Sequence, residues 1–529
     1  MRLVGGGRGR RPGRAVGLVL FSALMLGACA PAAGRSGLGS GASSTTSSKS
    51  VATTTTASTT TTTTLPPEPP VAPVQWTPCG ALLCGTVAVP LDYAQPQQGT
   101  IQIALAMHRA TDPSQRIGSL VIDPGGPGGS GVNDLPAELS VLTPGLQAHF
   151  DIVEFDPRGV ERSSPVLCSA PSSGSTSSQS SSDSGPLPDP VPSTPAAQLA
   201  LITNDEEYAA QCKAMSGKLL PVVGTVDTAR DLDRIRQALG DAQLTYFGHS
   251  YGTLIGAIYA QMFPTHVRAM VLDGAIDPAM STEEMVVEQS ESFESVLDDF
   301  FSWCASPGCA WRPAGGPSAA ALLALIDQSR QQRIPAGAGR STGPGELYYA
   351  LLDGLYARSD WPTLANALAA AAAGNGAPVL GMETSYTTSG GTNAVDAETA
   401  IDCLDHPVSG GVSGLRALAA QAAAQAPVFG PLLAWGESTC AVWPVASTRT
   451  PEATTAVGSP PIVVVGATKD PATPYVWAQR LAAELQHGEL VTWQGENHVA
   501  YYYSACVRSL DQGYFVSGTL PAPGTVCTD

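Results

Sequence analysis

Short apolar runs alternate with helix-like segments along most of the chain. The runs have the length of buried strands and comprise residues 101–107, 119–122, 151–155, 244–247, 269–272, 462–465 and 489–493. Between two of them, residues 227–239 place Leu232, Ile235 and Leu239 on one helical face, with Gly240 at the expected end. Such runs are typical of a mostly parallel sheet covered on both faces. The alternation therefore predicts an α/β fold.

The pattern changes between residues 277 and 458. This stretch is rich in Ala, Leu and Gln, has a helical pattern and lacks strand runs. It predicts a helical cap domain, inserted between late strands and lying over the carboxyl edge of the sheet. The core domain is then built from residues 75–276 and 459–529.

Two segments are too polar to bury a core. Residues 29–74 are rich in Ser, Thr and Pro, and residues 169–195 form a second low-complexity stretch. Neither can offset the entropy of ordering. We expect the first to be a disordered tether, and the second to be a disordered surface loop closed at its base by a Cys168–Cys212 disulfide.

The N-terminus has the pattern of an export signal. Five arginines precede an apolar stretch over residues 15–26, which is too short to span a bilayer. The following Leu26-Gly-Ala-Cys29 resembles a bacterial lipobox, so residues 1–28 are predicted to be a lipoprotein signal peptide and Cys29 the lipidated residue. An ordinary secretory signal is the alternative. No later stretch is apolar enough to cross a membrane, so we expect membrane contact only through this lipid anchor.

Cysteine usage agrees with export. Cys29 leaves ten of the eleven cysteines, an even number that suits an oxidising compartment. Pairing neighbours in sequence is the simplest proposal: Cys79–Cys84, Cys168–Cys212, Cys304–Cys309, Cys403–Cys440 and Cys506–Cys527. Zinc-ligand spacing is absent, and no metal or other cofactor is predicted.

Composition limits the classes of molecule that the protein is expected to bind. Of 529 residues, 43% are hydrophobic, which is ample for a large core, and the net charge is -18. Nucleic acid and anionic lipid surfaces both attract cationic patches, so neither is an expected partner.

One serine has the setting of a nucleophile. The strand run at 244–247 leads into Gly248-His-Ser250-Tyr-Gly252, and a helix pattern follows. A serine in Gly-x-Ser-x-Gly between a strand and a helix sits on a strained turn with its hydroxyl exposed to the site. This motif predicts an α/β-hydrolase fold with Ser250 as the nucleophile. Residues 339–343 also match the pentapeptide, but no strand pattern precedes Ser341, and we interpret that copy as a loop.

In this fold an acid and then a histidine follow the serine along the chain. His498 comes after the run at 489–493 on a predicted loop, which suits the base. Asp470 follows the run at 462–465 and is the preferred acid, which would orient the imidazole. Asp273, at the end of the run at 269–272, is the rival acid.

The oxyanion hole should combine two main-chain N–H groups. One belongs to Tyr251, after the nucleophile, and the other to the glycine-rich loop that follows the run at 119–122. Gly126 is the favoured donor and Gly125 the alternative. A phosphate-binding role is disfavoured because no Lys-Ser/Thr pair follows the loop.

These motifs carry a family resemblance. Ser119-Leu-Val-Ile-Asp-Pro-Gly-Gly-Pro-Gly-Gly-Ser130, Phe155-Asp-Pro-Arg-Gly159 and Gly466-Ala-Thr-Lys-Asp-Pro-Ala-Thr-Pro-Tyr475, with Cys506 and Cys527, resemble the secreted tripeptidyl aminopeptidases of actinobacteria, which are related to proline iminopeptidases. The resemblance implies serine exopeptidases that release short peptides from free N-termini, with Ser250, Asp470 and His498 as the triad. Glu496-Asn497-His498-Val499 departs from the Gly-His-Gly of many members, which predicts altered loop mobility or access.

An exopeptidase also needs a carboxylate for the substrate ammonium. Five glutamates of the first cap helix are available, but none is assigned this role: Glu283, Glu284, Glu288, Glu291 and Glu294. Two other functions remain open at this stage. They are an esterase or lipase using the same triad, and a non-catalytic surface lipoprotein.

Overall fold

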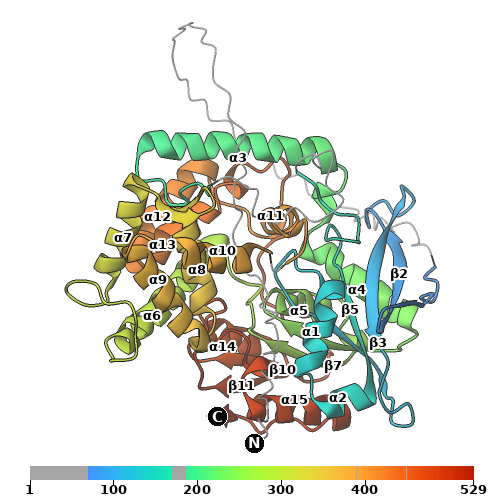
Figure 1. Ribbon diagram of the computed structural model, residues 1–529. Coiled ribbons are helices and arrows are strands. Elements are labelled where there is room, and N and C mark those ends of the chain that lie inside the picture. The colour runs from blue at the N-terminus through green and yellow to red at the C-terminus, as the bar shows by residue number, and fades with distance from the viewer. Residues whose placement is uncertain (1–69, 169–185, 389, 448) are drawn as a thin grey trace, which may run out of the picture.

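The computed structural model describes residues 70–168, 186–388, 390–447 and 449–529 (Figure 1). Its centre is a ten-stranded sheet in the order β1-β2-β3-β5-β4-β6-β7-β10-β11-β12. The strands are β1 (Thr77–Cys79), β2 (Leu82–Pro90), β3 (Thr100–His108), β4 (Gly118–Asp123), β5 (Phe150–Phe155), β6 (Leu244–His249), β7 (Val267–Asp273), β10 (Ile462–Ala467), β11 (Gly488–Trp493) and β12 (Val526–Cys527). Neighbours from β5 to β12 pair in parallel, whereas β1, β2 and β3 pair antiparallel.

All seven predicted strand runs lie in strands of this sheet, which confirms the α/β-hydrolase fold. One expectation was wrong in detail, because the run at 101–107 belongs to β3, which is antiparallel to both neighbours. The sequence reading also missed β1, β2 and β12. In β2 the buried Val87 and Val89 alternate with the exposed Thr86 and Ala88. This one-sided burial lacks the continuous apolar run that marks a central strand.

Helices cover both faces of the sheet. In β4, Val121 packs into one hydrophobic cluster while Leu120 and Ile122 pack into another, since successive side chains of a strand point to opposite faces. The first cluster includes residues of α4 (Thr225–Leu239), α5 (Tyr251–Met262) and α14 (Tyr475–Glu484), and the second includes residues of α1 (Gly131–Val141), α2 (Pro144–His149) and α15 (Ala505–Ser517). Gly240 ends α4 in the left-handed conformation at φ 80°, as the sequence predicted.

A largely helical cap follows β7 and precedes β10, and it lies at the carboxyl edge of the sheet (Figure 1). Its helices are α6 (Thr282–Cys304), α7 (Ala319–Gln331), α8 (Pro344–Leu355), α9 (Trp361–Ala372), α10 (Ala377–Thr388), α11 (Ala394–Asp405), α12 (Gly411–Gln425) and α13 (Phe429–Gly436). Short 3-10 turns occur at η2 (Leu220–Val222), η3 (Pro264–His266), η4 (Arg358–Asp360), η5 (Cys440–Val442) and η6 (Ala500–Tyr502).

The second Gly-x-Ser-x-Gly copy is a hairpin and not the loop expected from its glycines. Strands β8 (Ile334–Gly337) and β9 (Arg340–Thr342) pair antiparallel, and Ser341 lies in β9. Its hydroxyl accepts a hydrogen bond from Nε of Arg333 at 2.9 Å. A strand and a helix therefore flank this copy too, but the strands form a separate two-stranded sheet within the cap.

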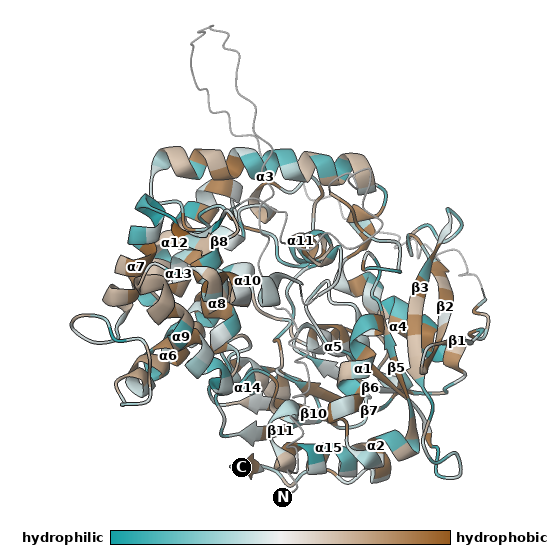
Figure 2. Cartoon of the chain, in the orientation of Figure 1, coloured by the Kyte–Doolittle hydropathy of each residue, from teal (hydrophilic) through white to brown (hydrophobic). Residues whose placement is uncertain are grey.

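Helix α3 (Pro195–Ser216) belongs with the cap, although its sequence precedes the nucleophile. It lies across the top of the molecule in Figure 1, and Figure 2 shows hydrophobic and hydrophilic residues alternating along it. The hydroxyl of Tyr208 donates to Oδ1 of Asp396 in α11 at 2.6 Å. The hydroxyl of Thr439, just before η5, donates to Asp205 at 3.2 Å. The cap is therefore assembled from two separate stretches of the chain.

Two predicted disorder boundaries need correction. Residues 186–194 are part of the described structure, and the N–H of Leu187 donates to Glu346 of α8 at 3.0 Å, so the disorder expected for 169–195 does not extend over these residues. Val74, placed in the tether, is buried, and its N–H donates to the carbonyl of Ala238 at 3.2 Å. The ordered part of the core domain, with its buried side chains and main-chain hydrogen bonds, thus includes Val74, which composition had assigned to the tether. Residues 169–185 lie outside the described residues.

The ten paired cysteines form the five disulfides predicted from sequence. The Cys168–Cys212 bond connects the end of the described core segment to α3, and Cys403–Cys440 connects α11 to η5. Five disulfides are typical of proteins in oxidising compartments. The signal segment and Cys29 lie outside the described residues. Within the part that is described, none of the helices has the length and apolarity to cross a bilayer.

Candidate active site

Ser250 lies on the sharp turn between β6 and α5. It has φ 54° and ψ -122°, a strained conformation for a residue with a side chain, and it is fully buried. Its neighbours must be small because the turn is tight. A Cβ atom at Gly252 would lie 2.5 Å from the main-chain oxygen of Asp123, and one at Gly248 would lie 2.5 Å from the oxygen of Gly252. The motif therefore forms the sharp, strained turn, or elbow, between strand and helix that it predicts.

Asp470 and His498 are brought together from two loops after neighbouring strands, β10 and β11. Nδ1 of His498 lies 2.9 Å from Oδ1 and 3.0 Å from Oδ2 of Asp470. The Asp470 carboxylate also accepts from the N–H groups of Ala472 and Thr473, both at 2.9 Å, and from the Thr473 hydroxyl at 2.9 Å. Nε2 of His498 and Oγ of Ser250 are buried, and neither has a hydrogen-bond partner among the described residues. This leaves Nε2 available to a reacting group.

The rival acid, Asp273, has a different task. Its carboxylate accepts from the N–H groups of Ala500 at 3.0 Å and Tyr501 at 2.7 Å, directly after the His498 loop. Its main-chain oxygen accepts from the N–H of Ser250 at 2.9 Å. Burial raises the pKa of Asp273 to about 6. Asp273 thus ties the elbow to the chain that follows His498, while Asp470 contacts the imidazole.

The glycine-rich loop after β4 lies against the elbow. A Cβ atom at Gly125 would lie 3.0 Å from Cβ of Ser250 and 3.1 Å from the amide nitrogen of Tyr251. The N–H of Gly125 already donates to Oδ1 of Asp123 at 3.0 Å, whereas the N–H of Gly126 is not bonded to any described residue. Tyr251 opens α5, where the first N–H groups lack intrahelical acceptors. Of the two glycines, Gly126 is thus the one whose N–H has no acceptor among the described residues.

Asp156 holds this loop in place. Its carboxylate accepts from the Ser130 hydroxyl at 2.5 Å and from the N–H of Val132 at 3.1 Å, at the start of α1. It also accepts from the N–H of Arg162 at 3.2 Å. The buried Asp of the Asp-Pro-Arg-Gly motif therefore joins the end of β5 to the glycine-rich loop through hydrogen bonds.

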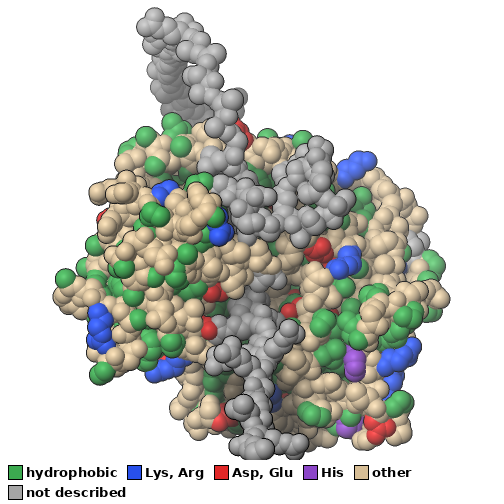
Figure 3. Space-filling view, in the orientation of Figure 1, with side chains coloured by type: hydrophobic (Ala, Val, Ile, Leu, Met, Phe, Trp, Pro, Cys, Tyr) green, Lys and Arg blue, Asp and Glu red, His purple; other side chains and the backbone are tan. Residues whose placement is uncertain are grey.

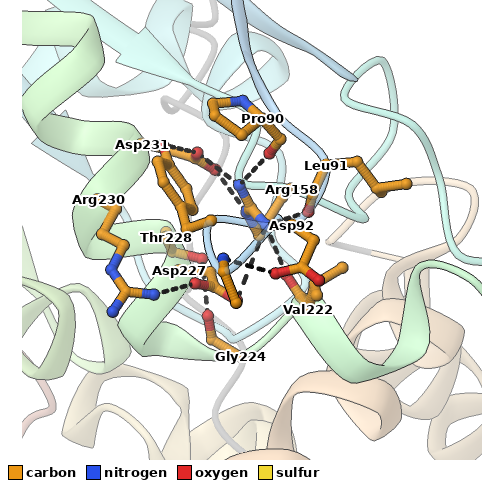
Figure 4. Close-up of polar contacts among 12 residues, drawn as sticks. Pro90, Leu91, Asp92, Arg158, Val222, Gly224, Asp227, Thr228, Arg230 and Asp231 are labelled. Atoms are coloured by element: carbon orange, nitrogen blue, oxygen red, sulfur yellow. Dashed lines mark hydrogen bonds and ion pairs between the residues drawn. The ribbon is translucent and has the colours of Figure 1, made fainter. Parts of the chain in front are cut away.

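Arg158 of the same motif is buried and structural (Figure 4). Nε and Nη2 donate to the two carboxylate oxygens of Asp231 in α4, each at 2.6 Å. The guanidinium also donates to the carbonyls of Pro90, Leu91 and Val222. Bidentate pairing with full hydrogen bonding is the arrangement in which a buried ion pair is tolerated. Arg158 thereby joins the end of β2, η2 and α4 beneath the site.

The cap contacts the loop of His498 directly. The N–H of His498 donates to the carbonyl of Tyr356 at 3.0 Å, and the two rings lie edge to face with centroids 5.4 Å apart. Oδ1 of Asn497 accepts from the N–H of Arg358 at 2.7 Å, and Glu496 forms an ion pair with the Arg358 side chain. The departure from Gly-His-Gly therefore supplies two side chains that bind the cap. Sequence reasoning missed Tyr356 and Arg358 because they lie more than a hundred residues away.

Four of the five glutamates considered for the substrate ammonium have other partners. Glu283 accepts from the N–H of Ser409, Glu284 caps α6 through Ser281, and Glu294 accepts from the N–H groups of Val428 and Phe429. Glu288 pairs with Arg480 and accepts from Trp477. Glu291 is exposed. The α6 carboxylates are therefore occupied by structural contacts or face solvent.

Another group of acids lies beneath the glycine-rich loop. Asp134 and Glu138 of α1 and Glu154 of β5 each bring a carboxylate oxygen within 4.8 Å of the others, with Nε2 of His249 3.6 Å from Glu138. Burial raises the pKa of Asp134 to about 7 and that of Glu154 well above its usual range. Three close carboxylates could hold a cation, an arrangement that the sequence did not predict because it combines a helix and a strand.

Comparisons with known proteins identify relatives of this chain. Residues 426–527 match the family described as TAP-like protein, and residues 223–289 match the family described as alpha/beta hydrolase. The chain is 35% identical over 492 residues to serine protease Hip1 of Mycobacterium tuberculosis, covering 86% of this chain and 91% of the relative. It is 31% identical over 478 residues to tripeptidyl aminopeptidase of Streptomyces lividans, covering 86% and 87%. It is also 36% identical over 499 residues to carboxylesterase B of M. tuberculosis, covering 87% and 91%.

Proposed function

Because the chain belongs to the tripeptidyl aminopeptidase-like family of α/β-hydrolases, we propose that it is an exported serine exopeptidase that releases short peptides, tripeptides above all, from free N-termini. The observation that carries this proposal is the contact of His498 with Asp470 beside the strained Ser250 elbow. The names of two relatives, a serine protease and a tripeptidyl aminopeptidase, support peptides as the substrate class.

In the proposed reaction, Ser250 Oγ attacks the scissile carbonyl while Nε2 of His498 takes the hydroxyl proton. Asp470 keeps the other ring nitrogen protonated and stabilises the imidazolium. The oxyanion of the tetrahedral intermediate accepts from the N–H groups of Tyr251 and Gly126. His498 then donates its proton to the leaving amine as the C–N bond breaks, which leaves an acyl-enzyme on Ser250.

Hydrolysis of the acyl-enzyme repeats these roles with water. His498 takes a proton from the water molecule as its oxygen attacks the ester carbonyl, and it returns the proton to Ser250 as the C–O bond breaks. The released peptide carries the new carboxylate. The proposed scheme needs no metal or other cofactor.

The proposed location follows from the cysteines and the N-terminal sequence. Five disulfides suit an extracytoplasmic enzyme. We propose that Cys29 is lipidated and that residues 29–74 tether the catalytic domain to the membrane, with secretion as the alternative. The mass of the N-terminal peptide of the exported protein distinguishes these two forms. The anchored form begins at Cys29 and carries the added lipid, whereas the secreted form carries no lipid.

A second candidate, a carboxylesterase, is supported by the name of one relative. The same triad would attack an ester carbonyl, so the two functions differ in the substrate pocket and not in the chemistry. The experiment is the hydrolysis of trialanine p-nitroanilide with a free N-terminus, its N-acetylated form and a short-chain p-nitrophenyl ester, each with wild type and Ser250→Ala. Cleavage of the free peptide alone, lost in the variant, supports the exopeptidase. Cleavage of the ester alone overturns it in favour of the esterase.

A further inference from the structure

Helix α11 of the cap contacts the glycine-rich loop near its start and Thr225 at its end. Near its start, a Cβ atom at Gly128 would lie 2.5 Å from the oxygen of Ala394 and 2.9 Å from the amide nitrogen of Glu398, so the helix contacts the glycine-rich loop. Its last residue, Asp405, accepts hydrogen bonds from Thr225, whose hydroxyl oxygen is 2.6 Å from that of Tyr251. The helix therefore extends from the glycine-rich loop to the side chains of Thr225 and Tyr251.

Two carboxylates of α11 are buried between these contacts. Glu398 is 0% exposed and Asp402 is 6% exposed. They are four residues apart and therefore share one helical face, with Asp405 nearly in line. Two tyrosines of the cap lie next to the predicted base. The ring centroids of Tyr386 and Tyr356 are 6.2 Å apart, and the Tyr356 ring contacts the imidazole of His498.

A third carboxylate comes from another element. The Cys403–Cys440 disulfide fixes η5 against α11 beside Asp402, and the N–H of Ala441 donates to the carbonyl of Glu437 at 3.1 Å. Glu437 is only 3% exposed, and its Oε2 atom is buried without a hydrogen-bond partner among the described residues. A buried, unsatisfied carboxylate oxygen is costly unless a cationic ligand or a proton reaches it.

The charges that act on these groups are negative. Burial, with the charges of Glu283 and Glu398, raises the pKa of Glu437 to about 8. Burial and the charges of Glu398, Glu437 and Asp405 raise the pKa of Asp402 well above its usual range. Figure 3 shows Asp and Glu side chains, together with some Lys and Arg side chains, on the cap and core surfaces of this face. The charges that act on Glu437 and Asp402 are thus negative, whereas Arg449 donates to the main-chain oxygen of Asp405, at the end of the helix, at 2.9 Å.

We infer that the carboxylates of Glu398, Asp402 and Glu437 form the subsite that binds the protonated α-amino group of the peptide substrate. The inference rests on the proposed exopeptidase function and names the recognition group that this function requires. An extended tripeptide spans roughly 10 Å. A carboxylate subsite in the cap would therefore select substrates with a short N-terminal segment before the scissile bond.

The test compares two substrates that differ only in the ammonium group. Trialanine p-nitroanilide carries it, and the des-amino analogue has a propionyl group in place of the first alanyl group. Each is measured with wild type and with Glu398→Gln, Asp402→Asn and Glu437→Gln, which keep the side-chain shape. Glu294→Gln is the matched control, because Glu294 is a half-buried cap carboxylate that binds the N–H groups of Val428 and Phe429. Thermal unfolding shows that each variant is folded.

Wild type is expected to prefer the free amine, and at least one of the three variants should raise KM for it by about tenfold or more. The same variant should leave kcat/KM for the des-amino analogue and for a p-nitrophenyl ester within about twofold of wild type. Equal losses on all substrates, or KM values like that of Glu294→Gln throughout, overturn the subsite. If wild type cleaves only the ester, the exopeptidase proposal itself fails. If wild type cleaves free and des-amino peptides equally well, peptidase activity stands and the ammonium subsite is overturned.

Discussion

The N–H of His498 donates a hydrogen bond to the main-chain oxygen of Tyr356, 3.0 Å away in the cap. Together with the contact of Asn497 with Arg358, this bond connects the loop of the base to η4. The cap therefore covers the site and also positions the imidazole. A group that must lie within hydrogen-bonding reach of the nucleophile gains from such support.

Asn497→Ala tests this support. The change removes the acceptor of the Arg358 N–H but leaves Tyr356 in place, so we expect kcat to fall by about tenfold with little change in the thermal unfolding midpoint. Glu496→Gln is the control, since an exposed ion pair contributes little, about 0–1 kcal/mol. Equal kinetics for the two variants would show that the Asn497 contact does not position the base.

Replacement of the two candidate acids should separate their roles. Asp470→Asn removes the charge beside Nδ1 of His498 and is expected to lower kcat by about 10³–10⁴-fold. Asp273→Asn places an amide near the N–H groups of Ala500 and Tyr501, and it should mainly lower stability. Both variants are measured for kcat and for thermal unfolding. A larger kcat loss in Asp273→Asn would assign the acid to Asp273 and contradict the account.

The buried Arg158–Asp231 pair should be critical for stability (Figure 4). Arg158→Ala leaves the buried Asp231 without its ion-pair partner, although the hydrogen bond from the Tyr93 hydroxyl remains, and we expect a loss of about 3–5 kcal/mol in the free energy of unfolding. Arg230→Ala, which removes the partly exposed partner of Asp227 on the same helix, is the control with an expected loss of about 0–1 kcal/mol. Denaturant unfolding measures both, and similar losses would refute the structural role of Arg158.

The raised pKa of Glu437 predicts a pH-dependent stability. In the unfolded chain this carboxyl loses its proton near its ordinary pKa of 4.5, whereas the folded protein keeps it up to about 8. The folded state thus binds more protons in this window, so its stability falls as pH rises from about 4.5 to about 8. Glu437→Gln removes the contribution of this group, while other carboxyls with a raised pKa, such as those of Asp134 and Asp402, remain in both proteins.

Thermal unfolding of wild type and Glu437→Gln at about pH 5 and about pH 8 checks the prediction. The variant should gain stability relative to wild type at the higher pH. An unchanged difference between the two proteins at both pH values would mean that Glu437 titrates normally in the folded state.

Local patterns in the sequence were enough to predict the sheet core, the helical cap and the elbow. Continuous apolar runs mark buried strands, and Gly-x-Ser-x-Gly marks a turn that only small neighbours allow. The pairing of His498 with Asp470 was predicted because each follows a strand run and because the acid and then the histidine come after the serine along the chain. Chain order alone could not exclude Asp273, whose hydrogen bonds became visible only in the structure.

Contacts between residues far apart in the chain could not be predicted from the sequence. The carboxylates of Glu398, Asp402 and Glu437 lie on a helix and on a turn joined by a disulfide, and nothing in their local sequence distinguishes them from solvent-exposed acids. The β8–β9 hairpin was missed because its glycines and proline resemble a loop. One-sided burial likewise concealed β2. In each case a tertiary contact, and not a local pattern, decides the structure.

The identity of the nucleophile is tested most directly by covalent labelling with diisopropyl fluorophosphate. The reagent phosphorylates an activated serine, and peptide mass spectrometry locates the adduct. The account predicts one adduct per chain, on Ser250, with loss of peptidase activity in parallel and no labelling of Ser250→Ala. Adduct on Ser341 or another residue, or full activity after Ser250 is labelled, would contradict it.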